Sequence, residues 1–295
     1  MAHLREGLPP GARAGDGGRV PGPQEGLAET EGVRMPTIGT VPPPQLMDDE
    51  AVEQVLGAFY RTPRAGGLDH LAGGGGPFGF DITAACRFHA LITLFGCDGI
   101  VESGCHLGDT TEYLARAYPH LPVRACDLDG QRAGFARARL AGRGNATVRH
   151  GDSGRLLPDL LAGLKHPLVF LDAHWGPDWP LRAELTALKD VSAVVVVDDF
   201  RIGHPRFGYD TYDGVVCGPD LAADTLPGLG RMFVGDVEAD YPLPCLQMGR
   251  RSGTGVIVLG LNDSPLVAHP WFAEVLLRPC PVLPSWSSVP EVRDR

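Results

Sequence analysis

The chain has 295 residues, of which 43% are hydrophobic and 21% are charged, and its formal net charge is -10. These proportions are typical of a globular protein with a sizeable core. The negative charge, with no run of basic residues to offset it, argues against nucleic acid and against an anionic membrane surface as partners.

The first segment, residues 1–45, is rich in glycine and proline and predicts a disordered tail. It lacks the apolar stretch of a signal peptide, and no run in the chain approaches the ~18 apolar residues that a membrane span needs. The cysteines form no CxxC pair and are interpreted as reduced thiols, so we expect a cytoplasmic protein. The seven are Cys86, Cys97, Cys105, Cys126, Cys217, Cys245 and Cys280.

Helical spacing of apolar residues predicts a first helix from Met47 to Thr62. From Asp81 onward, helices alternate with short apolar strands, which indicates a parallel sheet with helices on both faces. The sequence "VVVVDDF" (194–200) fits a strand buried on both faces that ends in two carboxylates. The five strands predicted in this part are residues 99–103, 123–129, 146–152, 167–172 and 193–199.

The rhythm changes after Gly214, where residues 231–237 and 253–260 predict an antiparallel pair of strands at one edge. The expected fold is therefore α/β, a doubly wound, mostly parallel seven-stranded sheet with an antiparallel edge strand. Residues 46–262 are expected to form this domain, and residues 263–295 a C-terminal tail.

The first strand-to-helix turn, "VESGCHLGDTT", places Glu102, Gly104 and Gly108 in the order E-x-G-x-x-x-G. A dinucleotide site favours G-x-G-x-x-G, in which the backbone closes on a pyrophosphate. The two glycines still allow a close approach of the chain to a ligand. A carboxylate at Glu102 repels a phosphate and suits a cation such as an amino acid's ammonium group.

Acidic residues also follow the second and third strands. Asp127 lies 19 residues after Gly108 and suits the hydroxyls of a ribose, with Asp129 as the alternative. Asp152 can accept from an adenine amino group, and Ser153 can donate to a ring nitrogen. A ligand with adenine, ribose and an amino-acid cation but no phosphate is S-adenosylmethionine (SAM).

These motifs resemble those of class I SAM-dependent methyltransferases. "VESGCHLGDTT" is similar to the first motif of that family, "CDLD" to the acidic second strand and "GDS" to the third. The resemblance implies a Rossmann-like methyltransferase fold, and it adds Thr110 to the expected SAM-binding residues. His106 stands at the middle glycine position of the family, a departure that can narrow the methionine pocket. The alternative is a nucleotide-binding or dehydrogenase-like sheet.

A second acidic group follows the fourth and fifth strands: Asp172, and the pair Asp198 and Asp199. If those strands are neighbours, the three carboxylates share one rim, where a hard divalent cation, Mg²⁺ or Mn²⁺, would relieve their repulsion. Successive strand residues point to opposite faces, so both members of the pair reach one ion only if the strand has already ended. His174 is a candidate general base, a fourth ligand or a plain hydrogen-bonding residue.

This second pattern resembles metal-dependent O-methyltransferases that modify sugar hydroxyls of natural products, of the macrocin and novobiocin type. The resemblance implies Asp172, Asp198 and Asp199 as metal ligands and puts His174 at the position of the subgroup's base, which is usually acidic. The alternative for the aspartate pair is an acidic turn or helix cap.

Aromatic side chains flank the same rim and suit an acceptor pocket, although loop packing explains them almost as well. They are Trp175, Trp179, His204, Phe207, Tyr209 and Tyr212. The expected function is Mg²⁺-assisted, SAM-dependent methylation of a hydroxyl on a small molecule such as a glycosylated secondary metabolite. The alternatives are a metal-independent SAM methyltransferase that acts on another nucleophile and a non-catalytic SAM-fold binding protein. A homo-oligomer is compatible with the resemblance.

Overall fold

A computed structural model of the chain describes residues 46–65, 75–173, 179–247 and 251–277. All of these residues belong to one compact unit, Pro44–Arg295. The predicted N-terminal tail, His174, Trp175 and Cys280 lie outside the described residues.

Helix starts follow the capping residues of the sequence. Helix α1 (Asp49–Arg61) begins after Asp48, whose carboxylate accepts a hydrogen bond of 2.8 Å from the backbone N–H of Ala51. A short 3₁₀ turn, η2 (Pro77–Phe80), leads into α2 (Ile82–Phe95). Asp81 caps α2 through the N–H of Thr83 at 2.9 Å, and a left-handed glycine, Gly96, ends it.

The main sheet has eight strands in the order β12-β9-β11-β5-β4-β1-β2-β3. Five of them are mutually parallel, as the alternation of helices and strands predicted. These five are β1 (Ile100–Ser103), β2 (Val123–Asp127), β3 (Ala146–His150), β4 (Leu168–Leu171) and β5 (Ala193–Val197). One helix follows each of the first four of these strands, and α7 follows β5 after a longer loop. These helices are α3 (Asp109–Ala117), α4 (Gly130–Arg139), α5 (Ser153–Leu161), α6 (Leu181–Leu188) and α7 (Pro219–Thr225).

The remaining strands of the sheet are antiparallel to their neighbours. Strand β11 (Gly255–Leu259) inserts between β5 and β9 (Arg231–Gly235) and runs antiparallel to both. An eighth strand, β12 (Phe272–Leu276), pairs with β9 after the short helix α8 (Ser264–Val267). The prediction of seven strands was therefore one strand short. Strand β12 lies in the segment that the sequence assigns to a tail, because its one-sided burial at the sheet edge leaves no clear apolar run.

Two small two-stranded sheets are formed by three short strands that follow β5 and by one that directly precedes β11. One pairs β6 (Phe207–Gly208) with β10 (Arg251–Ser252), and the other pairs β7 (Thr211–Tyr212) with β8 (Val215–Val216).

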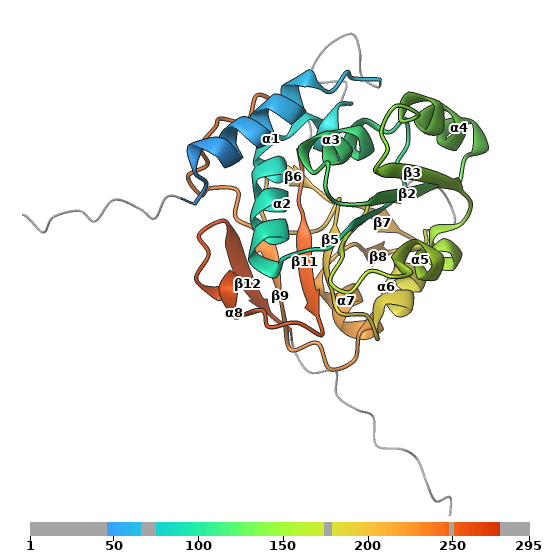
Figure 1. Ribbon diagram of the computed structural model, residues 1–295. Coiled ribbons are helices and arrows are strands. Elements are labelled where there is room, and N and C mark those ends of the chain that lie inside the picture. The colour runs from blue at the N-terminus through green and yellow to red at the C-terminus, as the bar shows by residue number, and fades with distance from the viewer. Residues whose placement is uncertain (1–45, 66–74, 174–178, 248–250, 278–295) are drawn as a thin grey trace, which may run out of the picture. The chain divides into compact units, whose positions relative to one another are not determined.

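Helices cover both faces of the main sheet (Figure 1). On one face, Phe170 and Val196 pack in a cluster with residues of α1, α2 and α3. On the other, Val169 and Val195 pack with residues of α5, α6 and α7. Alternate residues of β4 and β5 thus enter two different cores, which is why every residue of β5 is buried and why its sequence is a run of valines. The fold is the doubly wound, mostly parallel α/β fold that the sequence predicted, with one strand added.

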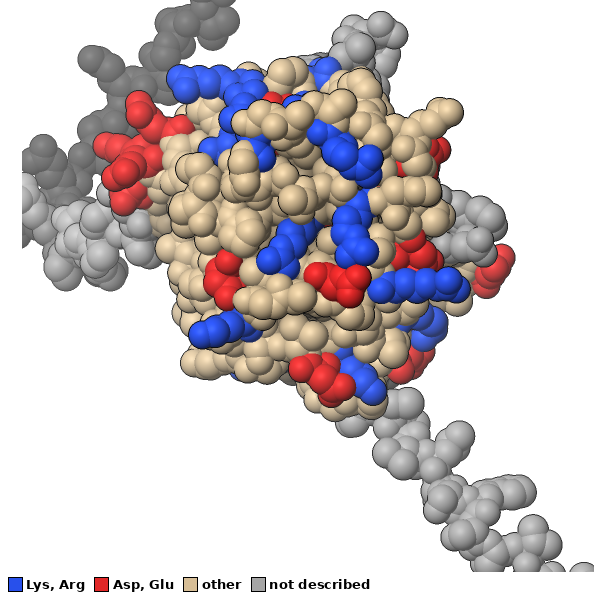
Figure 2. Space-filling view, turned by 45° about the vertical axis from the view of Figure 1, so that its right-hand side comes forward, with Lys and Arg blue, Asp and Glu red and all other residues tan. Residues whose placement is uncertain are grey.

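On the face shown in Figure 2, lysine and arginine side chains are interspersed with acidic and uncharged residues. Within the described ranges, no helix is long and apolar enough to span a membrane. The six described cysteines are free thiols, and five of them are buried.

Candidate active site

The carboxyl ends of β1, β4 and β5 lie side by side. Leu171 pairs with Val197, and the backbone N–H of Asp198 donates to the Leu171 carbonyl at 3.0 Å. The N–H of Asp172 donates in the same way to Ser103 at 3.1 Å. Strand β5 ends at Val197, and Asp199 has a φ of 45°, so the strand has ended before the aspartate pair. The geometric condition for both aspartates to face one site is therefore met.

The carboxyl groups of Asp172 and Asp198 are buried and act on one another. Burial and then the charge of Asp198 raise the pKa of Asp172 well above its ordinary value. Burial, followed by the charge of Asp199, raises the pKa of Asp198 to about 8. The structure thus brings two of the three predicted metal ligands into contact, at a cost in electrostatic repulsion.

The third predicted ligand, Asp199, is 6% exposed, and its Oδ1 accepts a hydrogen bond of 2.5 Å from Ser252 Oγ. No group of three or more described His, Cys, Asp or Glu residues is placed to hold a metal ion. The predicted three-carboxylate centre is therefore not formed by the described residues. Its oxygen donors nevertheless suit Mg²⁺, and no described lysine or arginine lies within 4.0 Å of the Asp172 or Asp198 carboxyl.

The glycine turn after β1 is fixed by the protein's own backbone. Gly104 has a φ of 73°, and a Cβ there would lie 2.5 Å from the carbonyl oxygen of Asp172. Glycine is thus required where the β1 and β4 ends meet. Gly108, with a φ of 77°, precedes the first turn of α3. His106, at a φ of 49°, donates its backbone N–H to Asp127 Oδ2 at 2.7 Å.

Asp127, at the end of β2, is the better placed of the two ribose candidates. It is 6% exposed, and its second carboxylate oxygen accepts from the N–H of Asp129 at 2.9 Å. Asp129 has a structural role instead, because its carboxylate caps α4 through the N–H groups of Gln131 and Arg132. The backbone amides on both sides hold the Asp127 carboxylate in a fixed orientation beside the glycine turn.

The predicted adenine residues have partners within the protein. Asp152 caps α5, with its carboxylate 3.0 Å from the N–H of Arg155. The Ser153 hydroxyl hydrogen-bonds to Glu184, a residue of α6 that is 1% exposed. Burial raises the pKa of Glu184 to about 7. Nothing in the local sequence signals Glu184, because it lies on the inner face of an otherwise ordinary amphipathic helix.

Glu102 is buried beneath the glycine turn at 1% exposure, and its Oε2 accepts a hydrogen bond of 2.5 Å from Thr111 Oγ1. Burial raises its pKa to about 7, and the nearby Asp127 and Asp109 carboxylates act in the same direction. The predicted SAM contact Thr110 has its hydroxyl oxygen occupied, since it accepts the N–H of Phe78 at 3.1 Å. Glu102 and its neighbours therefore form an acidic interior below the turn.

Asp109, the first residue of α3, was missed by the sequence analysis. Its carboxylate accepts the N–H of Ala65 at 2.9 Å and that of Gly76 at 2.6 Å, and it pairs with Arg139 of α4. Arg139 also donates to Glu112 at 2.6 Å. Through these contacts, the Asp109–Arg139 pair links two segments to the glycine turn: the residues that follow α1 and the residue that precedes η2. The only available signal was the position of an acidic residue directly after Gly108.

The aromatic residues on this rim lie partly in contact with one another. Trp179 and Tyr212 have ring centroids 5.0 Å apart, and the Tyr212 hydroxyl donates to Asp210 Oδ2 at 3.0 Å. Phe207 is buried and lies under the Arg251 guanidinium at 4.7 Å. Tyr209 is exposed. These contacts explain Trp179, Tyr212 and Phe207 as loop packing and leave the acceptor role as a prediction.

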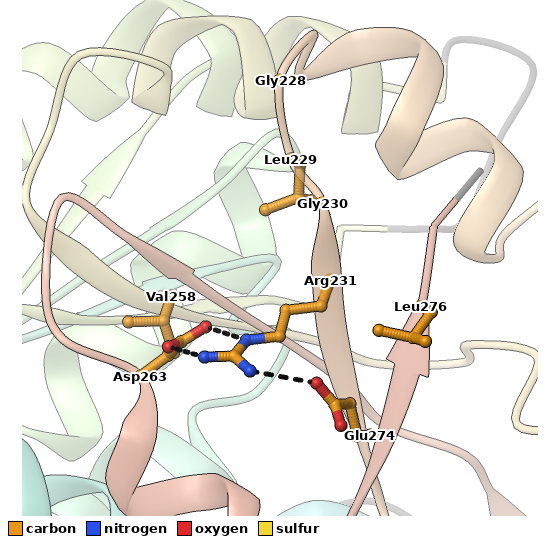
Figure 3. Close-up of a pocket in the computed structure, with 8 residues that line it drawn as sticks. All are labelled: Gly228, Leu229, Gly230, Arg231, Val258, Asp263, Glu274 and Leu276. Carbon is orange, nitrogen blue, oxygen red and sulfur yellow. Dashed lines mark hydrogen bonds and ion pairs between the residues drawn. The ribbon is translucent and has the colours of Figure 1, made fainter. Parts of the chain in front are cut away.

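Two hollows in the described part of the chain differ in their place relative to the site. A cavity of about 50 Å³ lies against Asp198 and is lined by Arg87 and Asp81 among others. A wider hollow of about 450 Å³ surrounds Arg231 at the opposite, amino edge of the sheet (Figure 3). There Arg231 is paired with Asp263 at 2.5 Å and with Glu274 at 3.1 Å, so its charge is already satisfied. Of the two hollows, the small cavity is the one that is lined by a predicted metal ligand, Asp198.

No protein-family model matches the chain, and no curated protein matches it. Among solved structures, it is similar to the O-methyltransferase TomG from Streptomyces achromogenes, involved in tomaymycin synthesis and solved with SAM. The identity is 22%, over 72% of this chain and 92% of TomG, with a TM-score of 0.43. Cofactor-bound Rv0187 from MTB shares 22% identity over 72% of this chain and 90% of its own, with a TM-score of 0.39.

A third similar structure comes from work on the conversion of a disulfide bond into a thioacetal group during echinomycin biosynthesis. It shares 18% identity over 73% of this chain and 93% of its own, with a TM-score of 0.42.

Proposed function

We propose that the chain is a SAM-dependent O-methyltransferase that methylates a hydroxyl of a small molecule with the assistance of Mg²⁺ or Mn²⁺. One observation carries the proposal: four neighbouring strands each place a carboxyl group at the same edge of the sheet. These groups are Glu102 of β1, Asp127 of β2, and Asp172 and Asp198 after β4 and β5. Ligands of open α/β sheets bind at this edge.

The charge of this edge selects among ligands. The charges of Glu102, Asp198 and Asp199 all act to raise the pKa of Asp172, so the carboxyl groups repel one another. A phosphate would add to this repulsion, whereas a cationic ligand reduces it. SAM carries a sulfonium and an ammonium group but no phosphate, and its ribose matches the oriented carboxylate of Asp127. This favours SAM over a dinucleotide.

The acceptor side is supported by the Asp172–Asp198 contact. Transfer of the methyl group forms an O–CH₃ bond, breaks the S–CH₃ bond, and requires that the acceptor hydroxyl lose its proton. A divalent cation held by Asp172 and Asp198 would stabilise the resulting negative oxygen. Asp199 directly follows Asp198 in the sequence, and its carboxylate accepts a hydrogen bond from Ser252. Its charge acts to raise the pKa of Asp172. His174 is the proposed proton acceptor.

A secondary metabolite or a sugar is proposed on the aspartate pattern alone, and the two rival functions remain distinct outcomes. A metal-independent methyltransferase would turn over without divalent cations. A non-catalytic SAM-fold protein would bind SAM without releasing S-adenosylhomocysteine.

Calorimetric titration of SAM and S-adenosylhomocysteine tests the donor site, and turnover on a panel of hydroxylated small molecules with and without Mg²⁺ tests the chemistry. Asp198→Ala is expected to abolish Mg²⁺-dependent turnover while it leaves S-adenosylhomocysteine binding in place. Asp159→Ala is the matched control, because this aspartate is in an exposed ion pair with Arg149. Absence of S-adenosylhomocysteine binding to the wild-type protein would contradict the proposed function.

A further inference from the structure

Arg87 of α2 is a buried cation without a carboxylate at ion-pair distance. It is 3% exposed, and its Nη1 donates to Thr83 Oγ1 at 3.3 Å and to the Tyr241 hydroxyl at 3.0 Å. No described Asp or Glu carboxylate lies within 4.0 Å of its guanidinium. Burial of a charge is costly unless it is paired, so this guanidinium is unusual in a domain of this size.

The nearest carboxylate on the same helix is already engaged. Asp81, at the start of α2, is 4% exposed and forms an ion pair of 2.9 Å with Arg251. It also accepts from the N–H and the hydroxyl of Thr83, at 2.9 and 2.7 Å. Although burial acts to raise its pKa, the charges of Arg87 and Arg251 lower it. Asp81 is thus the ion-pair partner of Arg251, and its charge acts on Arg87 from a distance greater than 4.0 Å.

Arg87 lines the cavity of about 50 Å³ that lies against Asp198. The walls are the rings of Phe78, Phe88 and Phe170, the Asp81 carboxylate, and Gly79, Ala84, Gln247, Ser252 and Thr254. This volume holds a small terminal group rather than a whole acceptor. The cavity thus combines apolar walls, the fixed positive charge of Arg87, the Asp81 carboxylate that is paired with Arg251, and direct contact with the proposed catalytic carboxyl group of Asp198.

The wall at Phe78 is held in place by α3. Phe78 has a φ of 52° and Gly79 a φ of 58°, both in the left-handed region, which is costly for phenylalanine. Thr110 accepts the N–H of Phe78, and Asp109 accepts the N–H of Gly76 just before it. Strained backbone that is held by its surroundings is characteristic of ligand sites.

We propose that this cavity binds the carboxylate of the methyl acceptor, with the Arg87 guanidinium as the recognising group. The inference rests on the proposed function and deepens it, since it narrows the acceptor to a hydroxylated small molecule that carries a carboxylate. A carboxylate supplies the negative charge that Arg87 lacks, and its planar shape matches the guanidinium fork. Bound there, it places the rest of the acceptor beside Asp198.

The test uses the smallest matched pair of probes, acetate and acetamide, which differ in charge but hardly in shape. NMR titration of ¹³C-labelled acetate and acetamide into the full chain, without divalent cations, measures the two dissociation constants. We expect acetate to bind at least tenfold more tightly than acetamide. Arg87→Met is expected to abolish this preference, and Arg87→Lys to keep part of it. Ala84→Val, which narrows the cavity without a change of charge, is expected to weaken both probes.

Equal binding of acetate and acetamide to the wild-type protein would overturn the proposal, and so would a preference that survives in Arg87→Met. If Arg87→Met fails to fold, the Ala84→Val variant provides the test. Acetate binding that is undiminished in Ala84→Val would show that acetate binds outside this cavity. S-adenosylhomocysteine titrations on the same samples report the donor site separately. If the wild-type protein does not bind S-adenosylhomocysteine, the proposed function is contradicted. If it binds S-adenosylhomocysteine but does not prefer acetate to acetamide, only the cavity assignment is contradicted.

Discussion

Asp172 and Asp198 are buried carboxyl groups that act on one another and that neighbouring parallel strands place at one edge of the sheet. Such a contact is unfavourable once both groups are ionised, and it is retained beside a cavity and a glycine turn. Carboxyl pairs of this kind are characteristic of sites that bind cations or transfer protons.

Replacement of Asp198 by asparagine is expected to separate function from stability. The asparagine N–H₂ group can donate to the Asp172 carboxylate, and the change removes the charge that repels it. We expect turnover to fall at least about 100-fold, because a group at the reacting centre is lost. The free energy of unfolding in urea at pH 8 is expected to stay the same or to rise. A drop in stability as large as the drop in activity would refute this view of the pair.

Glu184 is expected to make the protein less stable as the pH rises. Burial raises its folded-state pKa to about 7, so the folded protein keeps the proton between pH 4.5 and 7 while the unfolded chain loses it. Stability from this group therefore falls across that window, by roughly 3 kcal/mol in total, and is constant above it.

The measurement compares urea unfolding of the wild type and Glu184→Gln between pH 4 and pH 8. The glutamine variant is expected to gain stability relative to the wild type as the pH rises. Glu53→Gln, on the exposed face of α1, is the control and is expected to show a constant difference. A pH-independent difference for Glu184→Gln would show that this carboxyl group is not held in its neutral form.

Gly104→Ala is expected to destabilise the fold. The residue has a φ of 73°, and the new Cβ would meet the Asp172 carbonyl oxygen at 2.5 Å and the Ala173 Cα at 2.7 Å. Left-handed backbone alone costs roughly 1–2 kcal/mol for alanine, and the clash adds to it. Gly142→Ala is the matched control, since nothing lies within 4 Å of its Cβ position. Chemical denaturation of both variants that gave similar losses would contradict this account.

Asp109→Ala is expected to weaken the donor site as well as the fold. The change removes the acceptor of two backbone N–H groups and leaves Arg139 partly buried beside Glu112. We expect a loss of about 3 kcal/mol in unfolding free energy. Because α3 begins at this residue, S-adenosylhomocysteine affinity is expected to fall by at least about tenfold, which is about 1.4 kcal/mol.

Calorimetry gives the affinity, and Asp159→Ala is again the exposed control. If Asp109→Ala lost stability but kept full affinity for S-adenosylhomocysteine, the Asp109–Arg139 pair would have only a structural role.

The sequence by itself determined the layered fold and the edge at which the site lies. Apolar runs such as the valines of β5 reveal strands buried on both faces, and alternation with helices implies parallel order. In a parallel sheet all strands end at one edge, so acidic residues after each strand must gather there. Glu102, Asp127, Asp172 and Asp198 were therefore predictable at one edge from the local pattern, whereas the order of the strands, which makes them neighbours, came from the structure.

Only the tertiary structure decided which partners these groups have. Ser252 reaches Asp199, Glu184 reaches Ser153, and Arg87 faces the cavity beside Asp198, and in each case the partner comes from a distant part of the chain. The eighth strand was hidden for a related reason, since an edge strand needs no two-sided apolar pattern. Periodicity is a local property that the sequence displays directly, whereas the pairing of buried polar groups depends on how separate elements pack.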